Sequence, residues 1–207
     1  MSILPPPSDF HPQLSPDRLR LIASWLLEEL LATVDDLTRW TDNSWTRGTT
    51  AFGRQRSRIL AEWRSGKYPW LDVVDPGNAL VFTIDGVPCR FSNDDPDNPS
   101  KDAVVGVNPR QTSFALFARP GEPVRHCFVV DRVVGDMAEP YVAVDGFSAA
   151  GERVCRWVSD SVRAFTSIAA EQPASVDVEK AKLGPKQPSD GSGEKPAAAN
   201  DDLSEPQ

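Results

Sequence analysis

The chain has 207 residues, is 40% hydrophobic and carries a formal net charge of −8. No apolar run reaches the roughly 18 residues that a membrane-spanning helix needs, and the start, MSILPPPSDFHPQ, lacks the basic and apolar parts of a secretory signal. We therefore expect a cytoplasmic protein with one domain, a tail and no membrane partner.

The first helix is expected to follow a flexible N-terminal arm, residues 1–14. Ser15 is a good N-cap, Pro16 suits the first helical position, and Asp17 favours the positive end of the helix. Apolar residues then recur at three- and four-residue spacing, which predicts a helix over 16–39 with one buried face. They are Leu19, Ile22, Leu26, Leu30, Val34 and Leu37.

Leu21 and Trp25 lie outside that apolar stripe, because at about 100° per residue they point nearly the other way. Two interpretations stay open for them. An exposed leucine and tryptophan one turn apart would form a contact patch for a partner or a second subunit. Alternatively, the N-terminal arm or a sheet edge covers both side chains.

A second helix is predicted over 49–64, after a run of turn-forming residues. Its polar side carries Arg54, Arg58 and Arg64, which would suit contacts with nucleic acid phosphates. The solvent face of any amphipathic helix is also polar, so this signal is weak. Arg56 differs, because it interrupts the apolar side of the helix and therefore needs a hydrogen-bond acceptor.

Residues 79–158 alternate between strand-like runs and turns. Asp85 and Gly86 suit the positive φ angles of a type I′ hairpin turn, and Pro88 indicates a strand that begins at an edge. The order of elements predicts an α+β fold, with two N-terminal helices packed on an antiparallel, meander-like sheet of about five to six strands. The strands are expected over 79–84, 87–91, 113–118, 126–134, 141–147 and 153–158.

The last part of the chain divides into a closing helix and a tail. Residues 161–170 are expected to form a short helix that completes a single domain over 15–171. Residues 172–207 contain seven acids, four lysines and no aromatic residue. Because such a segment buries little apolar area, we expect a disordered acidic tail.

The segment FSNDDPDNPSKD forms an acidic loop after the expected hairpin. Its alternating aspartates resemble a calcium loop, but the glycine and the glutamate that such a loop needs are missing, so we expect no metal. The same residues suit Asx turns and Asp-Pro turns. A third hypothesis pairs Asp94, Asp95 or Asp97 with Arg56 or Arg90, which would hold the loop in position.

Catalytic motifs are missing from the sequence. Cys89, Cys127 and Cys155 fall in apolar strand-like runs and are expected to be buried thiols. His126 would lie on the opposite strand face from Cys127, so the two cannot act as a base and a nucleophile. The chain has no His-Glu-x-x-His, P-loop, dinucleotide-binding or nucleophile-elbow motif. These absences favour a protein that is not an enzyme and uses no cofactor.

Two stretches, WTRGTTAFGRQRSRI and PWLDVVDPGNALVFTIDGVPCRF, resemble a family of small, uncharacterised bacterial proteins when taken with the Asp-Pro loop that follows. The likeness covers about residues 40–160. Members tend to have a second aromatic residue where this chain has Ser92, and they are often encoded near phage-type repressors or mobile-element genes. The resemblance implies no particular activity.

These features together predict a non-catalytic protein that acts through protein contacts, as an interaction or regulatory accessory of a mobile-element or defence locus. Its partner would be another protein or a second copy of the chain. Two alternatives stay open. One is a nucleic-acid-associated protein that uses the helix 49–64, and the other is a metal-dependent hydrolase that uses acidic loop residues.

Overall fold

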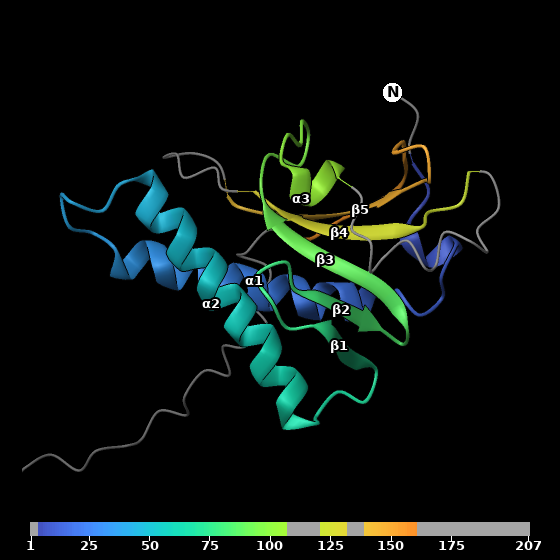
Figure 1. Ribbon diagram of the computed structural model, residues 1–207, viewed down its shortest axis with the longest axis horizontal. Coiled ribbons are helices and arrows are strands. Elements are labelled where there is room, and N and C mark those ends of the chain that lie inside the picture. The colour runs from blue at the N-terminus through green and yellow to red at the C-terminus, as the bar shows by residue number, and fades with distance from the viewer. Residues whose placement is uncertain (1–3, 107–120, 132–138, 161–207) are drawn as a thin grey trace, which may run out of the picture. The chain divides into compact units, whose positions relative to one another are not determined.

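The structure is a computed structural model that describes residues 4–106, 121–131 and 139–160. It has the expected α+β fold, with helices packed on a six-stranded sheet (Figure 1). The helices are η1 (Pro7–Asp9), α1 (Pro16–Asp36), α2 (Ser44–Ser65) and α3 (Asp102–Val105). The strands are β1 (Leu71–Asp75), β2 (Val81–Ile84), β3 (Val87–Asn93), β4 (Arg125–Val130), β5 (Val142–Phe147) and β6 (Arg153–Val158).

All of these elements belong to the first of two units of the chain, Met1–Glu171. The second unit, Gln172–Gln207, lies outside the described residues, and so do the strand expected over 113–118 and the helix expected over 161–170. Among the described helices, none is long and apolar enough to cross a membrane.

The sheet is mostly antiparallel, as expected, with one departure. Its strands lie side by side in chain order from β1 to β6, and every neighbouring pair is antiparallel except β3 and β4, which are parallel. A parallel pair cannot be joined by a tight turn and needs a crossover connection. Residues 94–124 make that connection, which includes α3.

The hairpin between β2 and β3 is confirmed, because Asp85 and Gly86 have φ angles of 47° and 82°. β3 is an interior strand, however, so the edge position expected from Pro88 is wrong. The proline is tolerated because pairing with β4 begins one residue later, at Cys89. The edge strands are β1 and β6. The sequence patterns missed β1, because only Leu71 of its five residues is buried.

The main core lies between the sheet and the helices α1 and α2. Phe82 packs on Phe128, and Phe52 of α2 stacks on Phe91 of β3 at 4.9 Å between ring centroids. The intervening strand residues point the other way, where Val104 of α3 packs with Cys127, Val129 and Phe147. We call these two sides the helix face and the α3 face; Figure 1 shows α1 and α2 on one side of the sheet and α3 on the other.

Both long helices differ from their expected bounds. α1 ends at Asp36, three residues early, because the chain turns at Leu37. α2 starts at Ser44, five residues early, because the Asn43 side chain accepts a hydrogen bond from the Thr46 N–H and caps the helix. It ends at Gly66, which has a φ of 67°.

The expectation of a flexible arm over residues 1–14 is corrected for the part that the structure describes. Pro7 and Leu14 are buried, and the Pro5 carbonyl accepts a hydrogen bond from the Arg156 N–H of β6 at 3.0 Å. The arm also places His11 against His126, with ring centroids 5.2 Å apart. Residues 4–14 are therefore packed on the end of the sheet.

Candidate functional site

The expected contact patch of Leu21 and Trp25 is absent. Trp25 is only 3% exposed, because Tyr68 packs on its ring at 5.1 Å between centroids. Tyr68 and Trp70 belong to the segment that leads into the edge strand β1, and Leu21 packs against the same core. For Trp25, the alternative interpretation of a covering arm or sheet edge therefore holds, since the segment that leads into β1 covers the ring.

Two of the three arginines on the polar side of α2 pair with carboxylates. Arg54 pairs with Asp36 of α1 at 2.7 Å. Arg58 lies within 2.9 to 3.7 Å of three glutamates, two of them on α1. Arg64, at the C-terminal end of the helix, is exposed. Two of the three arginines proposed to contact phosphate thus join α2 to α1.

The acidic loop is held by arginine, but not by either of the two arginines that the sequence singled out. Arg56 donates to the backbone carbonyls of Pro76 and Gly77, and Arg90 donates to the carbonyl of Ala79. Both arginines therefore donate to backbone carbonyls of the connection between β1 and β2. Arg56 therefore finds its acceptors in backbone oxygens, so the proposed pairing of Arg56 or Arg90 with the loop is wrong.

Asp94 and Asp95 hold the backbone of the loop. Asp94 accepts hydrogen bonds from the N–H groups of Ser100 and Lys101, which with its other backbone hydrogen bonds lower its pKa even though burial opposes the charged form. Asp95 accepts from the N–H groups of Asp97 and Asn98 in an Asx turn. Side-chain-to-backbone hydrogen bonds therefore shape the loop, in agreement with the hypothesis of Asx turns.

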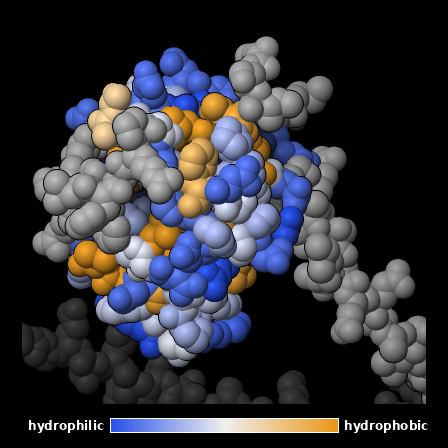
Figure 2. Space-filling model, turned by 90° about the vertical axis from the view of Figure 1, so that its right-hand side faces the viewer, coloured by the Kyte–Doolittle hydropathy of each residue, from blue (hydrophilic) through white to orange (hydrophobic). Residues whose placement is uncertain are grey.

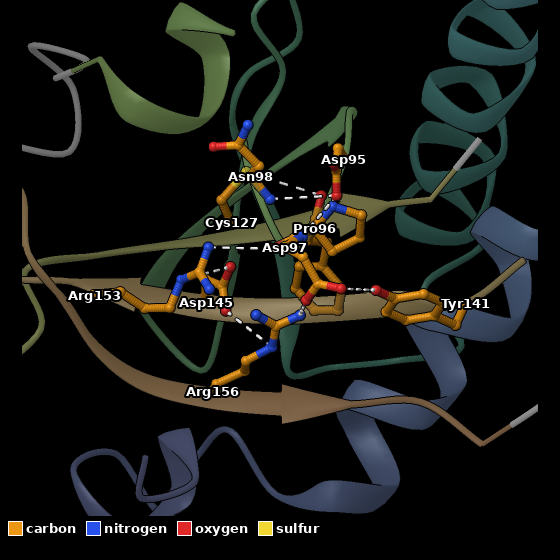
Figure 3. Close-up of polar contacts among 10 residues, drawn as sticks. Asp95, Pro96, Asp97, Asn98, Cys127, Tyr141, Asp145, Arg153 and Arg156 are labelled. Carbon is orange, nitrogen blue, oxygen red and sulfur yellow. Dashed lines mark hydrogen bonds and ion pairs between the residues drawn. The ribbon is translucent and has the colours of Figure 1, made fainter. Parts of the chain in front are cut away.

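Asp97 joins the loop to the sheet through an ion pair. Its carboxylate pairs with Arg156 of β6 at 2.8 Å and accepts from the Tyr141 hydroxyl at 3.4 Å (Figure 3). Arg153 of β6 donates to the neighbouring Pro96 carbonyl. The sequence patterns predict β6 as a strand. They do not predict this contact, because β6 lies far from the loop along the chain.

Under the loop lies Asp145 of β5, whose side chain is fully buried. Arg153 Nε lies 3.1 Å and Arg156 Nε 3.8 Å from its carboxylate oxygens. Burial raises the pKa of Asp145 to about 6, although the two arginines act in the opposite direction. We call Asp145, Arg153, Arg156 and Asp97 the Asp145 network; Figure 3 shows Arg156 in contact with both carboxylates and Arg153 beside Asp145.

The buried thiols and the buried histidine have environments that oppose catalysis. All three cysteines are buried thiols outside any disulfide, as expected. Burial raises the pKa of Cys127 and of Cys155 to about 12, so neither is a thiolate at neutral pH. Burial, with a smaller effect of His11, lowers the pKa of His126 to about 3. Among the described residues, no three His, Cys, Asp or Glu side chains are grouped as metal ligands.

The most unusual surface of the described chain lies at the connection between α1 and α2. Trp40 exposes 97% and Trp45 74% of its surface, although both are large apolar residues. Trp40 lies in the turn, and Trp45 lies in the first turn of α2. Figure 1 shows this connection at the far left. The sequence patterns placed Trp45 in a run of turn-forming residues, 41–48, and missed the exposure of both tryptophans.

Two grooves flank Trp45. One, of about 620 Å³, runs between α1 and the start of α2, and the other, of about 400 Å³, runs between α2 and the end of β3. The first is lined by Leu30, Thr33, Val34, Ser44, Trp45, Arg47, Gly48 and Ala51. The second is lined by Ser44, Trp45, Gly48, Thr49, Phe52, Ser92, Asn93 and Lys101. We call Trp40, Trp45 and these two grooves the tryptophan surface.

The face of the molecule shown in Figure 2, which lies on the right of Figure 1, has a different character. There, small hydrophobic patches are separated by hydrophilic residues. Scattered apolar residues of this kind are normal on soluble proteins and indicate no binding site.

Comparison of the chain with protein-family models, with curated proteins and with solved structures finds no match. The resemblance to a bacterial family stays a prediction, and the candidate site rests on the geometry described above.

Proposed function

We propose that the protein is a non-catalytic interaction protein that binds a segment of another protein at the tryptophan surface. The observation that carries the proposal is the exposure of Trp45 at the wall of the larger groove, together with the exposure of Trp40 in the turn that precedes α2. Trp40 contributes almost nothing to the core, because 97% of its surface is in water. Tryptophan is strongly enriched among the residues that dominate binding energy at protein interfaces.

The depth of the larger groove supports this role. Its floor contains Leu30 and Ala51, both nearly fully buried, and its rim contains Trp45. A pocket of this kind accepts a large apolar side chain of a partner, with the indole as one wall. The surface therefore offers both an anchor and a place to receive one.

Strand addition at the sheet edges is less well supported. At β1, the Leu71 N–H donates to the Tyr68 carbonyl and the Val73 N–H donates to the Asp72 carboxylate. At β6, the Arg156 N–H donates to the Pro5 carbonyl. These backbone groups at the sheet edges are already hydrogen-bonded, so they are not available to pair with an added strand.

Nucleic acid binding by α2 is also less well supported, because Arg54 and Arg58 are neutralised by carboxylates of α1 and α2. Nucleic acid binding has a separate test. Retention on DNA at low salt that is lost in Arg54→Glu with Arg58→Glu would favour it over the interaction proposal.

The interaction proposal is tested with a variant that carries Trp40→Ala and Trp45→Ala. Proteins captured from a lysate by the parent are purified, and their dissociation constants for parent and variant are measured by calorimetry. Since the loss of even one hot-spot residue costs about 2 kcal/mol, we expect binding to weaken by at least about 30-fold when both are removed. The matched control, Val158→Ala, removes an exposed apolar side chain from β6 and should leave binding unchanged.

The proposal fails if no purified partner depends on the two tryptophans. It also fails if light scattering shows that the parent dimerises and that the double variant does not, because the occupant would then be a second copy.

A further inference from the structure

The smaller groove of the tryptophan surface has a buried amide on its sheet side. Asn93, the last residue of β3, lines this groove and is only 3% exposed. Among the described residues, neither its Oδ1 nor its Nδ2 atom has a hydrogen-bond partner. Buried polar atoms nearly always have such a partner, because an unmade hydrogen bond in the interior lowers stability. Folding alone therefore gives no reason for an asparagine at this position.

The pleat of β3 directs the Asn93 side chain toward α2. Side chains two residues apart in a strand point to the same face, so Asn93 shares a face with Phe91. Phe91 stacks on Phe52 of α2, which makes this the helix face of the sheet. Phe52 and Trp45 line the α2 side of the smaller groove. The amide therefore points from the sheet toward the space that these two aromatic rings border.

The main chain around Asn93 is already bonded, so the side chain is not needed to build the strand or the loop. Asn93 pairs with Val130 of β4 in the parallel register, and its carbonyl accepts a hydrogen bond from the Lys101 side chain. The loop that follows is held by Asp94 and Asp95, whose carboxylates accept from backbone N–H groups. The amide of Asn93 is thus left for a group that comes from outside the chain.

A carboxamide selects its partner because it offers both kinds of hydrogen-bonding group. Its oxygen accepts and its nitrogen donates, so a second carboxamide satisfies both atoms through two parallel hydrogen bonds. A carboxylate only accepts, and an ammonium or guanidinium group only donates, so each would leave one atom of Asn93 unpaired. An apolar side chain would leave both atoms unpaired. The groove therefore favours an amide over a charged or an apolar group.

We propose that a glutamine or asparagine side chain of the bound segment enters the smaller groove and pairs with Asn93. Its N–H donates to Asn93 Oδ1, and its oxygen accepts from Asn93 Nδ2. A large apolar side chain of the same segment enters the larger groove, which is adjacent because Trp45 lines both grooves. Trp45 is 74% exposed, so few contacts hold its ring, and rotation of the ring widens the path to the buried amide. This inference rests on the proposed function, since it names the chemistry of the partner at the same surface.

The probe is a displayed library of random peptides. The parent protein is the bait, and the Trp40→Ala, Trp45→Ala variant removes peptides that bind elsewhere. We expect the remaining peptides to carry Gln or Asn at a fixed separation from Trp, Phe or Leu. Enriched peptides that share no amide side chain at any fixed position overturn the inference.

Asn93→Leu removes both polar atoms at nearly constant shape. The amide of a selected peptide is then buried without a partner, so we expect affinity to fall at least about tenfold. The thermal midpoint of the free variant should stay the same or rise, because apolar atoms replace an unpaired buried amide. Asn78→Leu makes the same change at an exposed asparagine that lines neither groove, and should leave peptide affinity unchanged.

The same peptide with Leu in place of its amide residue completes a double-mutant cycle. The parent should prefer the amide peptide at least about tenfold, and Asn93→Leu should lose that preference. If the variant instead melts earlier and weakens both peptides alike, Asn93 is a structural residue and the inference fails. Retention of adenine-containing single strands that depends on Asn93 would also overturn it, because asparagine pairs with adenine as well.

The outcomes separate the inference from the proposed function. If no enriched peptide depends on the two tryptophans, the proposed function fails at this surface. If binding depends on the tryptophans but neither on Asn93 nor on an amide of the peptide, only the inference fails.

Discussion

The tryptophan surface exposes apolar side chains to water, whereas the Asp145 network buries a charged one. At the first, apolar rings that normally stabilise a core stand in water. At the second, a carboxylate that normally stands in water is fully buried and is reached by the Nε atoms of two arginines. The first arrangement gives little stability and suits binding, whereas the second positions a loop on the sheet. Exposure and burial, rather than residue type, separate the two roles.

Among variants of the Asp145 network and the acidic loop, the largest effect is expected from breaking the network at Arg153. Arg153→Met leaves the buried Asp145 with Arg156 alone, at 3.8 Å. Removing one partner of a buried ion pair leaves an uncompensated charge, so we expect the free energy of unfolding to fall by about 3 kcal/mol. Urea denaturation measures it. Asp145→Asn removes the buried charge itself and should cost less, so a larger loss in that variant would contradict our account.

Two buried groups are expected to oppose each other as the pH changes. The pKa of Asp145 is raised to about 6, so between pH 6 and pH 4 the folded state holds a proton that the unfolded state lacks. Acidification through this range therefore adds stability. The pKa of His126 is lowered to about 3. Below about pH 6.5 the unfolded state therefore binds a proton that the folded state does not bind, so acidification lowers the free energy of unfolding.

In the Asp145→Asn variant, the protonation of His126 still lowers stability as the pH falls, but the opposing effect of Asp145 is gone. Relative to the parent, stability should therefore fall about 1.4 kcal/mol more steeply per unit of pH between pH 6 and pH 4. His126→Leu should change the slope by a similar amount in the opposite direction. Urea midpoints at several pH values measure both slopes, and parallel profiles for the parent and Asp145→Asn would refute the raised pKa.

The acidic loop gives a smaller effect. Asp94→Ala removes the acceptor for two backbone N–H groups and should lower the free energy of unfolding by about 1 kcal/mol. Because hydrogen bonds lower the pKa of Asp94, its contribution is complete above its ordinary pKa and is lost as the pH falls. Asp97→Ala removes an exposed carboxylate and should cost less. The reverse order would show that the ion pair, not the turn, holds the loop.

Local patterns in the sequence predicted local structure well. Periodicity identified both long helices, and Asp85 with Gly86 identified the hairpin, because these signals depend on neighbours a few residues apart. The site depended on tertiary contacts. Nothing near the loop indicates that its partner is Arg156, which lies 59 residues further along the chain. Trp25 and Trp45 are the same residue type on two helices, and only the fold shows that Tyr68 covers one and that the other stays exposed.

The smallest effect on stability is expected from the variant that should abolish binding. Trp40→Ala with Trp45→Ala removes two exposed rings, so we expect the free energy of unfolding to change by less than about 1 kcal/mol. Trp25→Ala is the matched change on a buried ring and should cost about 3 kcal/mol or more. If the exposed pair proves as costly as Trp25, the rings support the fold and the interaction proposal loses its basis. If the pair is neutral for folding but needed for a partner, the rings serve binding alone, as their exposure indicates.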